Sequence, residues 1–315
     1  MLPSRFLSRH VAGAALSCMV VAAPRVTPAQ MYAPPTAPVV VSTDWLAGHL
    51  TDPNLVVLHV GEKKEYDAGH IPGARYVKLD DISVSSHDRD TGLMLEMPQP
   101  DSLRARLEAL GISNSSRVIV YYGNDWVSPA TRVIFTLDYA GLGASAALLD
   151  GGMQAWKSEG RALTTIPPKP AAGQLAALHV KPIVVDAAWV RSRLGSPSLH
   201  LIDGRAAVFY DGVETGGSRK GHIAGARSLP YTEIADDKLH LRSADELRAL
   251  FARAGVAPGD TVVAYCHIGQ QATAVLFAAR SLGHPVLLYD GSYQDWSRRA
   301  DLPVEDPRAG KASAQ

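Results

Sequence analysis

Short apolar runs alternate with amphipathic segments along most of this chain. Residues 55–60 and 199–203 are rich in Leu, Val and Ile, as expected for strands that are buried on both faces. Residues 102–110 and 244–254 instead carry apolar side chains at helical spacing, and each segment ends at a glycine suited to a helix C-terminus. This alternation predicts an α/β fold with mostly parallel sheets and helices on both faces.

The same order of elements is written twice. Each half has a Gly-His-Ile-x-Gly-Ala turn after its first long strand, at residues 69–74 and 221–226, and each half ends with an apolar run, Asp-Gly and a tryptophan. A shared order with shared motifs indicates two copies of one domain. The predicted segments are an N-terminal domain (41–165), a Pro-rich linker (166–182), a C-terminal domain (183–305) and a polar tail (306–315).

The first residues differ from the rest of the chain. Arg5 and Arg9 precede an apolar stretch at 11–23 that is too short to span a bilayer comfortably. This pattern predicts a cleavable signal peptide over residues 1–29, followed by a flexible leader over 30–40. We therefore expect an exported, periplasmic protein without stable membrane insertion after cleavage. An uncleaved anchor and a misassigned start codon are the alternatives.

Charge and cysteine content narrow the function. The 315 residues include 31 basic and 31 acidic side chains, so nothing suggests a nucleic-acid partner or a polybasic membrane patch. The only cysteines are Cys18, inside the predicted signal peptide, and Cys266. The mature chain would thus carry a single thiol in an oxidising compartment, either reactive or available for pairing with another molecule.

Cys266 opens a six-residue loop between an apolar run at 261–265 and an apolar helical segment at 272–282. Backbone N–H groups of such a turn and the following helix N-terminus favour a thiolate and form an anion cradle. The alternative is a small buried hydrophobic residue at the end of a strand. The expected cradle consists of His267, Ile268, Gly269, Gln270, Gln271 and Ala272.

These motifs together resemble the rhodanese domain, and residues from about 45 to 296 are similar to the tandem-rhodanese sulfurtransferases, which act on thiosulfate or 3-mercaptopyruvate. The resemblance implies that Cys266 is the catalytic residue and becomes a persulfide. It also places Tyr122 at the cysteine position of the N-terminal domain, which is then catalytically silent and helps to wall the pocket. Trp126 is a candidate lining residue, with ordinary packing as the alternative.

The loop departs from the substrate patterns of this family. Thiosulfate-type members carry basic residues after the cysteine and mercaptopyruvate-type members a Gly-Ser-Gly or Gly-Thr-Gly run, whereas this loop has neither. Phe209 replaces an arginine that is common in the two-domain enzymes. Arg219 and Lys220 remain as possible anion-binding residues, with a solvated charge as the alternative, and Arg205 is expected to pair internally.

The histidines divide into two groups. His70 and His222 occupy the repeated turn of both halves, including the half without a cysteine, so we expect them to have structural hydrogen bonds. His267 occurs only beside Cys266 and is a candidate for stabilising the thiolate or an incoming anion. No metal or other cofactor is expected, since one cysteine and scattered histidines lack the spacing of a zinc site.

The predicted reaction is sulfur transfer in two steps through a persulfide on Cys266, from a small-molecule donor to a thiol or cyanide acceptor, with ping-pong kinetics. Two other functions stay open. A phosphatase or arsenate reductase would need an arginine at the end of the loop, where Gln271 stands. A non-catalytic sulfur carrier, sensor or binding protein of the same fold is the second alternative. The sequence predicts no oligomeric state.

Overall fold

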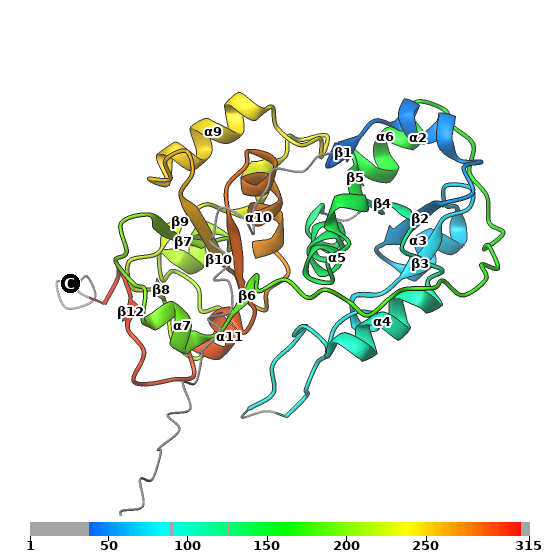
Figure 1. Ribbon diagram of the computed structural model, residues 1–315. Coiled ribbons are helices and arrows are strands. Elements are labelled where there is room, and N and C mark those ends of the chain that lie inside the picture. Colours follow the sequence, from blue (N-terminus) through cyan, green and yellow to red (C-terminus); the bar gives the residue numbers. More distant parts are fainter. Residues whose placement is uncertain (1–37, 89–90, 125, 310–315) are drawn as a thin grey trace, which may run out of the picture.

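A computed structural model describes residues 38–88, 91–124 and 126–309 of the chain. The predicted signal peptide and almost all of the leader lie outside these residues, as does most of the tail. The described chain forms two α/β domains joined by a segment without helix or strand between α6 and β6 (Figure 1). This segment passes beside the C-terminal end of α4, where Gly173 N donates to Glu108 O at 2.7 Å.

Each domain contains a five-stranded parallel sheet, and the two sheets have the same strand order. The order is β1-β5-β4-β2-β3 in the first domain and β6-β11-β10-β7-β9 in the second. The N-terminal strands are β1 (Val40–Val41), β2 (Leu55–Val60), β3 (Arg75–Val77), β4 (Arg117–Tyr122) and β5 (Ala146–Leu149). The C-terminal strands are β6 (Val184–Val185), β7 (Leu199–Asp203), β9 (Arg227–Ser228), β10 (Thr261–Tyr265) and β11 (Val286–Tyr289), and β8 (His222–Ile223) pairs with β12 (Val304–Glu305).

Helices cover both faces of each sheet, as predicted. Those of the first domain are α2 (Thr43–His49), α3 (Lys63–Ala68), α4 (Pro100–Ala109), α5 (Ser128–Tyr139) and α6 (Gly152–Ser158), with short 3-10 turns η1 (Leu79–Asp81) and η2 (Gly143–Ser145). Those of the second are α7 (Ala187–Arg191), α8 (Ala207–Tyr210), α9 (Ala244–Arg253), α10 (Ala272–Ser281) and α11 (Ser292–Trp296), with η3 (Tyr231–Ile234). None of the helices in the described part of the chain is long and apolar enough to cross a membrane.

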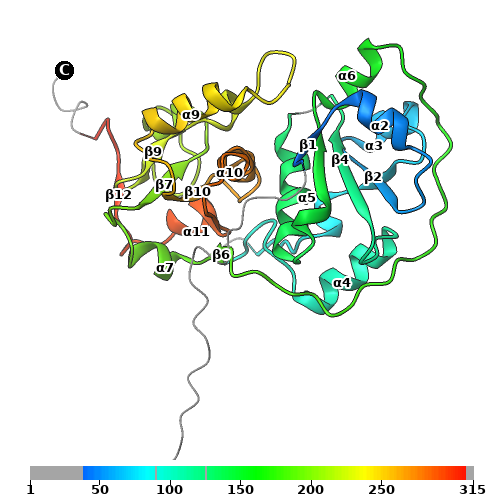
Figure 2. The same ribbon diagram turned by 45° about the horizontal axis from the view of Figure 1, so that its top comes forward.

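Alternation along β2 shows why both faces of the sheet are filled. Val56 and Leu58 join a large core that extends into the second domain, whereas Val57 belongs to a second core with Leu46 and Trp156. Successive side chains of a strand point to opposite faces, so an apolar strand needs a helical layer on each side. The large core continues across the domain interface, where α5 and α10 pack against each other (Figure 2).

The duplication extends to single hydrogen bonds. The hydroxyl of Tyr121 accepts from Ile71 N, and that of Tyr265 accepts from Ile223 N. Tyr121 and Tyr265 are therefore equivalent, and the residues that follow them, Tyr122 and Cys266, are equivalent as well. The predicted placement of Tyr122 at the cysteine position is confirmed.

The two turn histidines are equivalent in the same way. His70 stacks on Tyr66 at a centroid distance of 3.8 Å and His222 stacks on Tyr210 at 3.7 Å. Nδ1 of each histidine lies 2.8 Å from the carbonyl oxygen of its tyrosine. The predicted structural role of these histidines is confirmed, because each orders a turn in its own domain.

Candidate active site

Cys266 lies directly after β10, at the carboxyl end of the C-terminal sheet, and directly before the loop that leads into α10. It is the only free cysteine among the described residues, and its side chain is completely buried. The adjacent residues His267 and Ile268 are partly exposed, as are Gln270 and Gln271. The thiol therefore sits at the base of a loop whose upper residues reach the surface.

Hydrogen bonds to its carbonyl oxygens hold the loop in place. Five of them accept hydrogen bonds from groups outside the turn or from the first residues of α10. These bonds are Tyr293 N to Cys266 O (3.0 Å), Gln294 N to His267 O (3.0 Å), Arg132 Nη1 to Gly269 O (3.1 Å), Thr273 N to Gln270 O (3.1 Å) and Ala274 N to Gln271 O (3.0 Å).

This arrangement fixes the direction of the N–H groups. All described peptide bonds are trans, and in a trans peptide the N–H of the next residue points opposite to the carbonyl. The N–H groups of residues 267, 268, 270, 271 and 272 therefore point away from the partners that hold the carbonyls. None of the N–H groups from 267 to 272 donates to a described protein acceptor. The loop thus offers a row of unpaired donors, which is the requirement for an anion cradle.

Gly269 is required by the loop conformation. Its φ of +83° lies in the left-handed region that favours glycine. A Cβ on this residue would also lie 3.0 Å from Arg132 Nη1 and 3.0 Å from Asp290 O. The glycine thus permits both the turn and the close approach of its neighbours.

Ser292 holds the cysteine from below. It adopts a φ of +51°, which is strained for a residue with a side chain, and it is fully buried. Its hydroxyl accepts from Cys266 N at 3.2 Å and donates to Tyr289 O at 2.9 Å. The equivalent residue of the first domain is Gly152, where a Cβ would lie 2.7 Å from the ring of Tyr122. The small Cys266 therefore leaves space for a serine that the large Tyr122 excludes.

Aromatic side chains border the loop on one side. Tyr231 lies beside Gln271 and Cys266, and burial raises the pKa of its phenol. Trp126, from the first domain, makes an edge-to-face contact with Tyr231 at 5.8 Å. The indole N–H of Trp126 and Oε1 of Gln271 are both buried without a hydrogen-bond partner among the described residues. Such unpaired groups at the edge of the loop are available to a bound molecule.

His267 contacts a different set of residues. Its Nδ1 lies 3.1 Å from Gly216 O, and Phe209 meets its ring edge-on at 4.6 Å. Burial lowers the pKa of His267, although the hydrogen bond to Gly216 O opposes this effect. The lowered pKa favours the uncharged imidazole, and the role of His267 in stabilising the thiolate or an incoming anion stays a prediction.

Arg205 pairs internally, as predicted. It is fully buried, donates through Nε and Nη2 to Asp203, and also donates from Nη2 to Gly221 O at 2.8 Å. Its guanidinium carbon lies 4.0 Å from the ring centroid of Tyr293. Arg205 thus braces β7 against the repeated turn.

The anion-binding prediction for Arg219 needs correction. Its guanidinium donates to four carbonyl oxygens at and beyond the C-terminus of α11, those of Trp296, Ser297, Arg299 and Leu302. Four of its five N–H groups are thus occupied, and the residue acts as a helix C-terminal clamp. Lys220 is exposed, with Nζ 3.5 Å from Val213 O, and its anion-binding role stays a prediction.

Tyr122 fills the equivalent site of the first domain. It is fully buried, and its hydroxyl donates to Leu239 O of the second domain at 2.6 Å. Burial raises the pKa of this phenol, so it remains protonated. A neutral tyrosine committed to an interdomain hydrogen bond supplies no nucleophile, which agrees with the expected silence of this domain.

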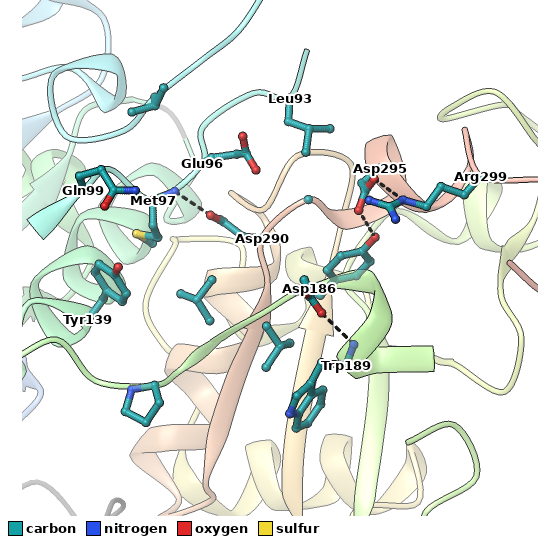
Figure 3. Close-up of a pocket in the computed structure, with 16 residues that line it drawn as sticks. Leu93, Glu96, Met97, Gln99, Tyr139, Asp186, Trp189, Asp290, Asp295 and Arg299 are labelled. Atoms are coloured by element: carbon teal, nitrogen blue, oxygen red, sulfur yellow. Dashed lines mark hydrogen bonds and ion pairs between the residues drawn. The ribbon is translucent and has the colours of Figure 1, made fainter. Parts of the chain in front are cut away.

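A cleft of about 850 Å³ opens between the domains, and Asp290 is one of its lining residues (Figure 3). Cys266 is not among its lining residues, which include Glu96, Asp186, Trp189, Asp290, Asp295 and Arg299. Asp290 faces the cleft yet also pairs with Arg132 behind the cysteine loop, so the cleft and the loop share one side chain. In the described part of the chain no cluster of His, Cys, Asp or Glu is arranged to hold a metal ion.

Sequence reasoning missed Arg132 and Ser292. Arg132 has a recognisable signal, because it is a single arginine within the otherwise mostly apolar segment that forms α5. A buried charge of this kind requires a partner. Ser292 gives only the weak signal that it replaces the second glycine of the first half's Asp-Gly-Gly.

Two stretches of the chain, residues 42–159 and 186–299, match the rhodanese-like domain. With two parallel α/β units and a cysteine loop at the end of one central strand, the chain belongs to the rhodanese family in a two-domain form.

The alignments with relatives include both domains. The 3-mercaptopyruvate sulfurtransferase of Escherichia coli (strain K12) is 31% identical over 280 residues, which cover 84% of this chain and 97% of that protein. The sulfur carrier protein TtuD of Thermus thermophilus is 32% identical over 286 residues, which cover 84% and 96%. The crystal structure of SseA from Escherichia coli, described as a 3-mercaptopyruvate sulfotransferase, aligns with a TM-score of 0.72 at 28% identity, covering 82% of this chain and all of that one.

Proposed function

We propose that this protein is a sulfurtransferase that moves a sulfane sulfur from thiosulfate or 3-mercaptopyruvate to a thiophilic acceptor through a persulfide on Cys266. The observation that carries the proposal is the row of unpaired N–H groups from residue 267 to 272 beside Cys266, the one free cysteine of the described residues. Preorganised donors of this kind stabilise a negative charge without reorganisation during the reaction.

With thiosulfate, the Cys266 thiolate attacks the outer sulfur and forms a new S–S bond. The S–S bond of thiosulfate breaks, and sulfite leaves with the electron pair. With 3-mercaptopyruvate, the thiolate attacks the thiol sulfur, the C–S bond breaks, and the thiol proton ends on the carbon of the departing enolate to give pyruvate. Either donor leaves Cys266-S-S⁻ in the loop.

The acceptor completes the cycle. A thiolate or cyanide attacks the outer sulfur of the persulfide, and the Cys266 thiolate leaves with its electron pair. The covalent intermediate divides the transfer into two steps, so donor and acceptor obey ping-pong kinetics.

The side chains around the loop favour no strongly anionic donor. Phe209 packs against His267, whose pKa is lowered by burial, and Trp126 packs against Tyr231. Recognition thus depends on the backbone donors and on the unpaired groups of Trp126 and Gln271. We expect 3-mercaptopyruvate to be used at least as well as thiosulfate, because its single carboxylate needs fewer cationic partners than the thiosulfate dianion.

A sulfur carrier is the second candidate, favoured by the similarity to a protein named as a sulfur carrier. The test incubates the purified mature protein with each donor and cyanide, and measures thiocyanate, with Cys266→Ala as the control. Repeated turnover supports the enzyme. A single equivalent of transferred sulfur supports the carrier, and no transfer from either donor contradicts both.

We also propose export to the periplasm after removal of residues 1–29, on the basis of the N-terminal pattern alone. Expression of the full chain with N-terminal sequencing of the periplasmic product tests this proposal. A mature N-terminus near Gln30 supports it, whereas an intact Met1 in the cytoplasmic fraction contradicts it.

A further inference from the structure

Arg132 crosses from the silent domain to the cysteine loop. It extends from α5, and only 1% of its side chain is exposed. Nη1 donates to Gly269 O at 3.1 Å and to Asp290 Oδ1 at 3.0 Å. Nη2 donates to Leu95 O, within the silent domain. One guanidinium therefore joins the silent domain, the cysteine loop and the turn after β11.

The contact with Gly269 O bears directly on the cradle. Glycine populates positive and negative φ about equally, so the orientation of its peptide group depends on outside contacts. Of the five carbonyls held around the loop, that of Gly269 is the one whose donor is a side chain of the other domain. Since the peptide is trans, holding Gly269 O toward Arg132 turns the N–H of Gln270 the opposite way, into the row of unpaired donors.

A second set of contacts from the silent domain supports the same arrangement. Met97 N donates to Asp290 Oδ2 at 2.6 Å (Figure 3), and Met94 N donates to Gln294 Oε1 at 3.0 Å. The backbone of Gln294 in turn holds His267 O. Leu95, which lies between these donors, has a φ of +57°, an uncommon conformation that its carbonyl's bond to Arg132 helps to maintain.

The interface also provides a matched control. Arg280 of α10 reaches in the opposite direction, and its Nη2 lies 3.2 Å from Gly143 O and 3.5 Å from Asp138 Oδ1. Its side chain is 16% exposed. Arg280 therefore makes the same kinds of interdomain contact as Arg132, a carbonyl and a carboxylate, without touching the cysteine loop.

We infer that Arg132 is a positioning residue for Cys266: the silent domain supplies the side chain that fixes the Gly269 peptide and so completes the cradle for the thiolate and the persulfide. The inference rests on the proposed function only in calling the stabilised species a persulfide. The effect of the loop on Cys266 can be measured as the reactivity of the thiol, without any turnover.

The test uses the full mature chain with Arg132→Met and the control Arg280→Met. The rate of Cys266 alkylation by iodoacetamide is measured across pH, alongside kcat and KM. Arg132→Met should move the alkylation profile to higher pH and lower kcat about tenfold with a smaller change in KM, because one donor to a charged sulfur is misdirected. Arg280→Met should leave the alkylation profile unchanged.

Arg132→Met also leaves the buried Asp290 without its cationic partner, which can prevent folding. The double variant Arg132→Met/Asp290→Asn removes that charge and keeps an acceptor for Met97 N. It should show the same shifted alkylation profile, and Arg132→Lys, which keeps the positive charge on a single donor nitrogen, should restore part of the wild-type behaviour.

An alkylation profile equal to that of wild type in a folded Arg132 variant overturns the inference, whatever the activity of the enzyme. Equal shifts in the Arg132 and Arg280 variants overturn it as well, since they would show a general loosening of the interface. Absence of sulfur transfer in the wild type contradicts the proposed function instead, and leaves the alkylation comparison interpretable.

Discussion

The protein is expected to lose stability as the pH falls from neutral to mildly acidic, and replacing His59 by phenylalanine should remove much of this loss. His59 is completely buried near the end of β2, and both ring nitrogens lack a hydrogen-bond partner among the described residues. The rings of Tyr66, Tyr76 and Tyr121 surround it at centroid distances of 5.4, 6.1 and 4.9 Å. This setting suits a neutral aromatic side chain and disfavours a cation.

The size of the stability loss follows from the pKa of His59. Burial lowers the pKa of His59 from 6.5 to about 4, with nearby Glu65 opposing this change and His70 and Lys157 adding to it. As the pH falls, the unfolded chain takes up the proton first, so the stability present above the unfolded pKa is lost between about 6.5 and about 4. At 1.36 kcal/mol per pH unit the full loss is about 3 kcal/mol, of which about 2 kcal/mol falls between roughly pH 7 and roughly pH 5.

Urea unfolding at a series of pH values measures this loss. The free energy of unfolding of His59→Phe should fall by about 2 kcal/mol less than that of wild type between those pH values. At neutral pH the variant should be at least as stable as wild type, because two unsatisfied buried polar atoms are removed. His87→Phe is the control, since His87 is exposed. Parallel pH curves for wild type and His59→Phe would refute the reasoning.

Three further substitutions have distinct expected results. Gly269→Ala should abolish sulfur transfer and lower the unfolding free energy by about 1–3 kcal/mol, because its φ is positive and its Cβ would press on Arg132; activity retained in a folded variant would contradict the loop geometry. Tyr122→Phe should cost about 1 kcal/mol in urea unfolding through loss of the bond to Leu239 O, with kcat unchanged; a large fall in kcat would show that the first domain is not silent. Arg219→Met should lower the melting temperature while KM for the donor stays the same; a raised KM at unchanged stability would restore the anion-binding assignment.

Most of the fold was predictable, because the determining signals are local. Apolar strands and capped helices repeat in the same order, and the structure places Gly111 and Gly255 at positive φ directly after the predicted helices. The equivalence of Tyr122 and Cys266 followed from the same repeat, and the hydrogen bonds of Tyr121 and Tyr265 confirm it.

The candidate site was predictable only in part. The loop residues are contiguous with Cys266, so a local pattern could identify them. The partners of Arg219 and of Gly269 O come from residues about 80 and 137 positions away, and no local pattern specifies such contacts. Arg219 therefore resembled a free anion-binding group, and the contribution of Arg132 was not anticipated.

The central claim is that Cys266 carries a sulfur atom in its cradle. Intact mass measurement of the mature protein after incubation with thiosulfate or 3-mercaptopyruvate, followed by peptide mapping, tests it most directly. The account predicts a gain of one sulfur atom located on Cys266, lost on addition of cyanide and absent from Cys266→Ala. An unchanged mass with both donors, in protein whose Cys266 is shown to be reduced, would contradict it.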